Sequence, residues 1–127
     1  MSDSQSQTPL RILVVDDDSL VRMGTVAMVE ELGHIVVAEA GSGAQALALL
    51  REAGSVDLLL TDQAMPGMTG QQLAEAAREM RPGLPVLLAT GYADQGVAGT
   101  KNLPRLPKPY GLDDLAAVLS AFAKGTT

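Results

Sequence analysis

The chain has 127 residues, no cysteine and a net charge of −6, with 46% hydrophobic and 19% charged residues. This length fits one domain with its own core, and the composition is that of a globular protein. The absence of cysteine excludes a disulfide framework and suits a reducing compartment such as the cytoplasm. The acidic charge and the scarcity of aromatic residues disfavour direct binding of nucleic acid, and no apolar run is long enough to predict a membrane span.

Short apolar strands and amphipathic helices alternate along the chain after a polar lead. Residues 1–9 are expected to be disordered. The patterns predict strands, in chain order, at 11–15, 34–40, 56–61, 85–90 and 103–106, and helices at 19–32, 44–53, 71–80 and 112–123. Ser19 is expected to cap the first helix, and the Gly-rich segment 91–100 allows only a short or frayed one. We therefore expect one domain over residues 10–123, followed by a tail at 124–127.

The uniformly apolar strands predict an α/β fold with a doubly wound parallel sheet, covered by helices on both faces. The carboxyl ends of parallel strands meet at one edge, where such folds keep their sites. The first strand delivers Asp16 and Asp17 to this edge, the third delivers Asp62 and the fourth delivers Thr90. Lys108 follows the fifth strand. The sequence therefore predicts three acids, a hydroxyl and a lysine in one place.

These residue types together indicate phosphoryl chemistry. Crowded carboxylates repel one another unless a cation offsets them, and a hard divalent ion such as Mg²⁺ suits oxygen ligands. Lys108 can pair with Asp62 or with a phosphoryl oxygen, and Thr90 can donate a hydrogen bond to the same oxygens. The set predicts a phosphoryl-accepting site whose covalent product is an aspartyl phosphate.

Each residue has a simpler explanation when it is taken alone. Residues 16–18 could be acids that favour a helix N-terminus, Asp62 could form a turn before Pro66, and Lys108 could be a surface lysine between two prolines. All of these signals fall at strand ends, however, in the one order that a parallel sheet would bring together. His34, the only histidine, begins a strand and is interpreted as structural.

Four motifs carry a family resemblance: ILVVDDDSLVR, LLLTDQAMPGMTG, LLATGY and LPKPY. Together they cover about Leu10 to Phe122 and resemble the receiver domain of two-component response regulators. The resemblance implies a flavodoxin-like, CheY-like fold, with a five-stranded parallel sheet in the order 2-1-3-4-5 wrapped by five helices. It also implies a partner, which is a sensor histidine kinase, including the hybrid type, or a histidine phosphotransfer protein.

The resemblance assigns a role to each candidate site residue. Asp62 would be the phosphoacceptor, Thr90 the switch hydroxyl and Lys108 the lysine that contacts the phosphoryl group. The implied Mg²⁺ ligands are Asp16, Asp17, Asp62 and the backbone carbonyl of Ala64. Nothing after the last helix suggests an output domain, so a stand-alone receiver is expected, with an unidentified downstream protein target.

Two features depart from the family pattern. Arg105 occupies the usual place of the switch aromatic, and the short segment between Thr90 and Lys108 implies that the family's fourth helix is reduced. In addition, Ala64 and Tyr92 flank the expected approach of the hydrolytic water. An apolar Ala64 and a bulky Tyr92 would orient this water poorly, which predicts a long-lived phosphoryl state.

Two alternatives stay open beside the favoured receiver, which would perform only autophosphorylation and slow self-hydrolysis. One is a pseudo-receiver or adaptor that binds partners without phosphorylation. The other is a haloacid-dehalogenase-like phosphatase that uses Asp16 and Asp18 as its D-x-D pair, although Asp62 then has no role. Dinucleotide binding is disfavoured because no G-x-G-x-x-G follows the first strand.

Overall fold

The computed structural model describes residues 9–91 and 103–124. The five strands are β1 (Arg11–Val15), β2 (Ile35–Ala40), β3 (Leu58–Asp62), β4 (Val86–Thr90) and β5 (Arg105–Pro107). The helices within these residues are α1 (Ser19–Glu31), α2 (Gly43–Glu52), α3 (Gly70–Met80) and α4 (Leu112–Lys124). The reduced helix expected near residues 91–100 falls almost wholly outside the described residues.

The strands form one parallel sheet in the order β2-β1-β3-β4-β5, which confirms the predicted fold. Strand β1 lies directly beside β3, with Val15 opposite Thr61. The residues that follow these two positions are therefore neighbours at the end of the sheet: Asp16 just after β1, and Asp62 as the last residue of β3. The register alone thus places the first and third strands' acids together at the carboxyl edge.

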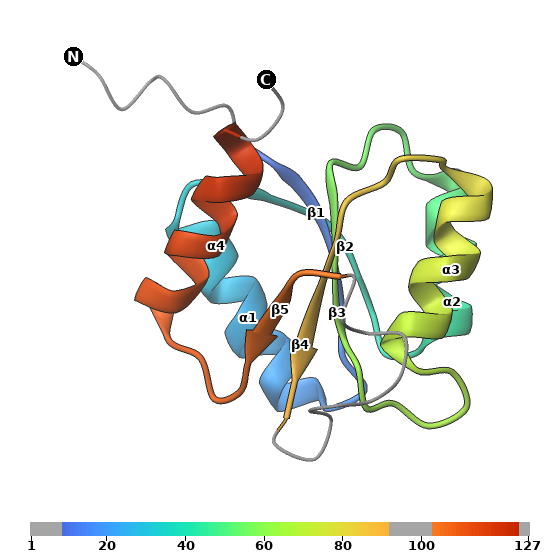
Figure 1. The fold of residues 1–127 in the computed structure, drawn as a ribbon, viewed down its shortest axis with the longest axis horizontal. Coiled ribbons are helices and arrows are strands. Elements are labelled where there is room, and N and C mark those ends of the chain that lie inside the picture. The colour runs from blue at the N-terminus through green and yellow to red at the C-terminus, as the bar shows by residue number, and fades with distance from the viewer. Residues whose placement is uncertain (1–8, 92–102, 125–127) are drawn as a thin grey trace.

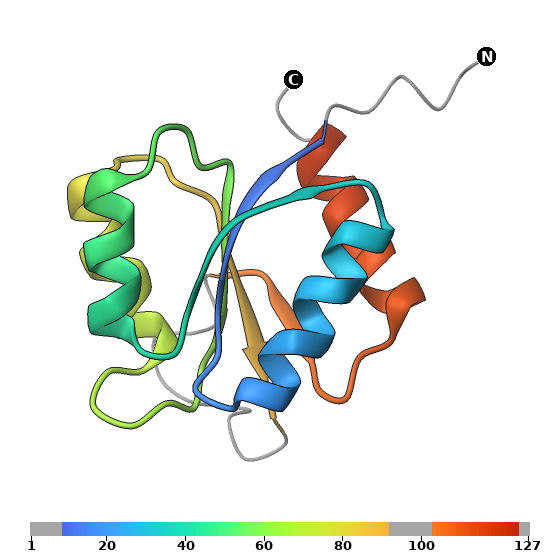
Figure 2. The ribbon, with the colours of Figure 1, turned by 180° about the vertical axis from the view of Figure 1, so that it is seen from behind.

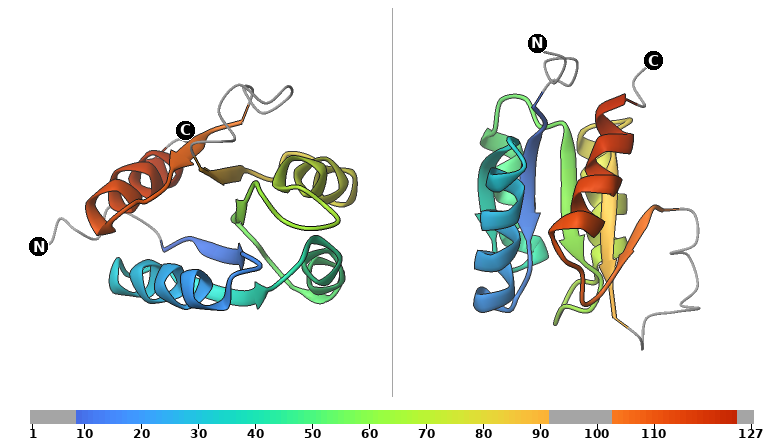
Figure 3. Two further views of the ribbon diagram at one scale, coloured as in Figure 1. Left: turned by 90° about the horizontal axis from the view of Figure 1, so that it is seen from below. Right: turned by 90° about the vertical axis from the view of Figure 1, so that its left-hand side faces the viewer.

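Helices cover both faces of the sheet, as Figures 1 and 2 show. Figure 3 shows the layers end-on, with α1 and α4 on one face and α2 and α3 on the other. Side chains alternate along β1, so that Leu13 packs in the core under α2 and α3 while Ile12 and Val14 pack under α1 and α4. Because both faces are covered, the three inner strands β1, β3 and β4 are mainly apolar.

The start of α1 corrects one sequence prediction. Asp18, and not Ser19, is the N-cap, because the Asp18 carboxylate accepts hydrogen bonds from the backbone N–H groups of Leu20 and Val21. Ser19 is the first residue of the helix. A carboxylate is a strong cap and its charge favours the helix N-terminus. At the other end Gly33 has a φ of 89°, a conformation that favours glycine just past a helix.

The two edge strands are less regular than the sequence suggested. Strand β2 exposes Ile35 and Glu39, so it is only partly covered. Strand β5 has three residues and begins after Pro104, whose carbonyl accepts a hydrogen bond from the backbone N–H of Leu88. The prediction that Pro104 marks an edge strand is confirmed, since a proline can accept from the neighbouring strand but cannot donate.

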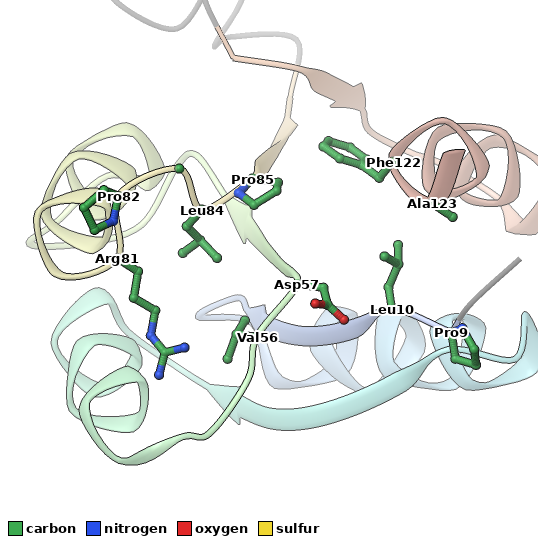
Figure 4. A pocket seen from close by; sticks show the side chains of 11 residues that line it. Pro9, Leu10, Val56, Asp57, Arg81, Pro82, Leu84, Pro85, Phe122 and Ala123 are labelled. Carbon is green, nitrogen blue, oxygen red and sulfur yellow. The ribbon is translucent and has the colours of Figure 1, made fainter. Parts of the chain in front are cut away.

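The amino edge of the sheet holds a hollow of about 590 Å³ (Figure 4). The charged groups that line it already have partners. The Asp57 carboxylate accepts from the backbone N–H of Arg11, and the Arg81 guanidinium donates to three carbonyls at the end of α2. Because these charges are used to hold backbone groups, the amino edge is structural. None of the helices in the described part of the chain is long and apolar enough to cross a membrane.

Candidate functional site

Three carboxylates meet at the carboxyl edge of the sheet. Oxygen atoms of Asp16, Asp17 and Asp62 all lie within 4.8 Å of one another. Asp16 and Asp62 are 4% and 5% exposed, whereas Asp17 is open to solvent. Two buried acids and one accessible acid form a site that an ion can enter from solvent and bind through oxygen ligands.

Lys108 bridges the two buried acids. Its Nζ lies 3.0 Å from Asp62 Oδ1 and 3.6 Å from Asp16 Oδ2. The backbone N–H of Lys108 donates to the carbonyl of Thr90 at 2.7 Å, which continues the pairing of β5 with β4. This bond fixes the lysine to the end of the neighbouring strand, and Thr90 itself is 3% exposed at that end.

The electrostatics of the site disfavour negative charge on Asp62. Burial raises the pKa of the Asp62 carboxyl above its ordinary value, more than the hydrogen bond and charge of Lys108 lower it, and the charge of Asp16 raises it further. Burial alone would lower the pKa of Lys108, but the hydrogen bond and charge of Asp62 raise it overall, so the ammonium stays charged. One lysine does not balance three acids, and an added cation would favour the ionised form of Asp62.

The loop after Asp62 is held firmly in place by Gln63. The side chain of Gln63 is 4% exposed, and its Oε1 accepts from the backbone N–H of Gln71 at 2.8 Å, in the first turn of α3. Its backbone carbonyl accepts from Gly70, where an added Cβ would collide with the carbonyl of Asp62. Ala64 lies exposed in this loop, and its backbone hydrogen bond to Asp62 lowers the pKa of that carboxyl. The roles of Gln63 and Gly70 were not predicted, because a glutamine in a turn and a glycine at the start of a helix carry no distinct signal in the sequence.

Arg22 orients the loop after β1. Its Nη1 donates to the carbonyl of Asp16 at 2.7 Å, and its Nε pairs with Glu39 at 3.3 Å. The Asp16 carboxylate accepts from the backbone N–H of Asp18, whose own carboxylate caps α1. Asp18 therefore stands outside the acid cluster and is committed to the helix, an arrangement that does not favour the phosphatase alternative.

Two other residues singled out in the sequence, Arg105 and His34, have roles outside the acid cluster. Arg105 is half-buried in β5 and lines a separate apolar groove with Val86, Val118 and Phe122. Tyr92 lies outside the described residues. His34 accepts a hydrogen bond at Nδ1 from the backbone N–H of Leu10, a contact that ties the start of β2 to β1.

The fold and the site together define a doubly wound α/β protein with an acidic, lysine-bridged centre suited to phosphoryl groups and divalent cations. The response regulator receiver domain family matches residues 12–119, and the chain belongs to this family. It is thus a receiver domain of two-component signalling, a class that accepts phosphoryl groups and binds Mg²⁺ at an acidic aspartate cluster.

Three similar proteins illustrate the match. The chain is 36% identical over 115 residues to the sensor kinase CckA of Brucella abortus. The aligned region covers 85% of this chain but only 12% of CckA. The chain is also 38% identical over 109 residues to the response regulator receiver protein CpdR of the same organism, covering 83% of this chain and 89% of CpdR. The solved REC domain of AraT, a response regulator from Geobacillus stearothermophilus, superposes with a TM-score of 0.80 at 31% identity, covering 93% and 95% of the two chains.

Proposed function

We propose that Asp62 is the residue that accepts the phosphoryl group. The observation that carries this assignment is the position of the Asp62 carboxylate, which lies beside the other two acids and 3.0 Å from Lys108 Nζ. Asp16 also pairs with Lys108, but at the longer distance of 3.6 Å, and Asp62 ends the central strand β3. The exposed acid Asp17 lacks such a partner lysine among the described ion pairs.

The donor set suits Mg²⁺. The carboxylates of Asp16, Asp17 and Asp62, with the backbone carbonyl of Ala64, would hold the ion, in agreement with the preference of Mg²⁺ for oxygen. When bound, Mg²⁺ supplies positive charge that stabilises the oxygens of the transferred phosphoryl group. The raised pKa of Asp62 supports this assignment, because a nearby cation would favour the ionised nucleophile.

The proposed reaction is transfer from a phosphohistidine of a kinase or phosphotransfer protein. A carboxylate oxygen of Asp62 attacks phosphorus, the P–N bond breaks, and its electron pair returns to the imidazole nitrogen. Lys108 then contacts a phosphoryl oxygen in place of the Asp62 oxygen. Its ammonium thereby pairs with the negative charge of the transferred group. Thr90, buried at the end of β4, would donate its hydroxyl to another phosphoryl oxygen.

The partners follow from the proteins that the chain resembles. CckA is named a sensor kinase and CpdR a response regulator receiver protein, so we place this chain in a phosphorelay that includes a sensor kinase, of the hybrid type among others. We propose that it acts in the cytoplasm as a receiver that passes on the phosphoryl group or a conformational change to a downstream protein. Arg105, at the position of the family's switch aromatic, would make that conformational change differ from the usual one.

The test is the intact mass of the protein after incubation with Mg²⁺ and acetyl phosphate. We expect one added phosphoryl group, which disappears without Mg²⁺ and in Asp62→Asn. The matched control is Asp57→Asn, the same change at the amino edge, which should be phosphorylated like the parent. A phosphoryl group that persists in Asp62→Asn would overturn the assignment. If neither acetyl phosphate nor a phosphorylated histidine phosphotransfer domain modifies the parent, the adaptor alternative holds instead.

The lifetime of the phosphoryl state follows from the same measurement over time. Ala64 is exposed beside the acids and offers no polar group from its side chain to orient a water molecule. We therefore propose slow hydrolysis, with the added mass lasting for minutes after the phosphodonor is removed. Ala64→Asn adds an amide that can orient water, and it should shorten the lifetime. Loss of the parent's added mass within seconds contradicts this proposal.

A further inference from the structure

The residue two positions after Lys108 makes a specific contact with α1. The hydroxyl of Tyr110 lies 2.7 Å from the hydroxyl of Thr25, a hydrogen-bond distance. Thr25 is 4% exposed, at the middle of α1, and the surrounding core under α1 and α4 is apolar. Inside such a core each hydroxyl has few other partners, so the two hydroxyls hold each other in one geometry.

This pair lies directly beneath the acid cluster. A narrow space between the sheet and α1 is lined by Thr25 and Tyr110 together with Asp16 and Asp62. A second small pocket, of about 220 Å³, is lined by Thr25, Tyr110 and Lys108. The hydrogen-bonded pair therefore borders both the buried acids and the residue that bridges them.

The contact completes the anchoring of that segment. Before Lys108, the chain is fixed by the backbone hydrogen bond from Lys108 to Thr90. After Lys108, the chain turns toward α4, and within that turn the hydroxyl of Tyr110 bonds across the structure to Thr25. The lysine side chain has four rotatable carbons, so the position of its ammonium depends on how well its backbone is fixed. A phenylalanine could fill the space of the Tyr110 ring, but it could not bond to Thr25.

We propose that Thr25 and Tyr110 are positioning residues, whose shared hydrogen bond holds Lys108 Nζ between Asp16 and Asp62. The bond ties the lysine segment to α1, so a partner that shifts α1 would also shift the lysine. This inference rests on the proposed function, because a well-placed Lys108 matters for accepting a phosphoryl group on Asp62. Neither residue touches the phosphoryl group; both act through Lys108.

The kinetic test compares hydroxyl-deleting variants with a hydroxyl-retaining one. Tyr110→Phe and Thr25→Val should each slow phosphorylation of Asp62 by acetyl phosphate about two- to tenfold, the equivalent of one hydrogen bond. The Mg²⁺ dissociation constant should stay within about twofold, because the acids are unchanged. The double variant should be no slower than either single one, since both remove the same bond. Thr25→Ser keeps a hydroxyl and should restore the parent rate.

A second readout does not depend on phosphorylation. In the metal-free protein without phosphodonor, the NMR order parameter of the Lys108 ε-methylene should be high and should fall in Tyr110→Phe. If Thr25→Val does not fold, Tyr110→Phe carries the test alone. An unchanged order parameter in Tyr110→Phe overturns the inference, as do equal phosphorylation rates in all variants. A parent that is not phosphorylated, but whose lysine loosens in Tyr110→Phe, refutes the proposed function and leaves the positioning role standing.

Discussion

The two edges of the sheet use charged residues in opposite ways. At the amino edge, the Asp57 carboxylate holds a backbone N–H of β1, and the Arg81 guanidinium holds the carbonyls at the end of α2 (Figure 4). Arginine suits this task because its fork of donors reaches several carbonyls at once, and positive charge is favourable at a helix C-terminus. Charge at this edge completes the hydrogen bonding of the backbone.

At the carboxyl edge the charges face one another. Asp16, Asp17 and Asp62 converge, and Lys108 is the cation that pairs with the two buried ones. The arrangement leaves an excess of negative charge at a partly buried site. This excess destabilises the metal-free protein and attracts a cation. A charged residue therefore indicates a binding site when its neighbours leave its charge unbalanced, and a structural role when they balance it.

The largest effect should come from the loss of an acid at the carboxyl edge, compared with the same loss at the amino edge. We expect Asp17→Asn to weaken Mg²⁺ binding by about 10- to 100-fold or more, because it would remove a charged ligand from the proposed Mg²⁺ site, and phosphorylation should slow accordingly. Asp57→Asn should leave both unchanged and reduce stability by about 1 kcal/mol or less. Calorimetric titration with Mg²⁺ checks the pair. Equal Mg²⁺ affinities in the two variants would contradict the conclusion that only the carboxyl edge binds the ion.

A pair of glycines tests how tightly the carboxyl edge is packed. Gly70→Ala places a methyl group against the carbonyl of Asp62 and should cost about 1–3 kcal/mol while it also slows phosphorylation. Gly54→Ala, at the amino edge, has no atom within 4 Å of the added methyl group and should be nearly neutral. Chemical denaturation gives both free energies of unfolding. A stable, active Gly70→Ala variant would show that the loop after β3 can move.

Removal of the arginine at the amino edge should reduce stability without changing the rate of phosphorylation. Arg81→Gln leaves carbonyls at the end of α2 without their charged donor, which should cost about 1–3 kcal/mol. Arg81→Lys keeps the charge but loses the fork, so it should recover part of that stability. The rate of phosphorylation should stay at the parent value in both variants. A slower rate would mean that a change at the amino edge alters the site at the carboxyl edge.

Replacement of Asp62, unlike replacement of Arg81, should raise the stability of the metal-free protein. The pKa of Asp62 is raised, chiefly by burial, so its ionised form is disfavoured by folding. The metal-free parent should therefore lose stability as the pH rises from the acid's unfolded pKa through its folded pKa. Asp62→Asn should lack this loss and unfold at a higher temperature at pH 7 without Mg²⁺. Thermal unfolding across pH checks the sign, and a lower unfolding temperature for Asp62→Asn contradicts it.

The smallest change in stability should come from His34. Burial lowers the pKa of its imidazole. Its Nδ1 accepts from Leu10, so the folded state favours the neutral ring. The unfolded chain binds the proton more readily, and stability is therefore present above about pH 6.5 and declines as the pH falls below it. The decline should be slight because the ring is only partly buried. His34→Gln keeps an acceptor but does not titrate, so its stability should depend less on pH in this range.

The sequence predicted the order of the strands and the pairing of Lys108 with Asp62, but it did not predict the hydrogen bonds that hold the surrounding segments. The strand order followed from a family resemblance. The meeting of Asp16 with Asp62 followed from parallel strands whose carboxyl ends converge. The N-cap was predicted wrongly, because residues 16–19 offer four side chains that can cap and only backbone geometry selects Asp18. The bond between Thr25 and Tyr110 joins residues 85 positions apart, and no local pattern in the sequence marks it.

The hydrogen bonds that frame β4 and β5 have a consequence for how this protein can diversify. Leu88 donates to Pro104 on one side of the connection, and Lys108 donates to Thr90 on the other. The chain between Thr90 and Pro104 therefore leaves and rejoins the sheet at two fixed points. Insertions, deletions and new sequences can accumulate between these points while Thr90 and Lys108 keep their places. A change of sequence or length between these points need not disturb the reactive centre, because the pairing of β5 with β4 sets the positions of Thr90 and Lys108 independently of the connection.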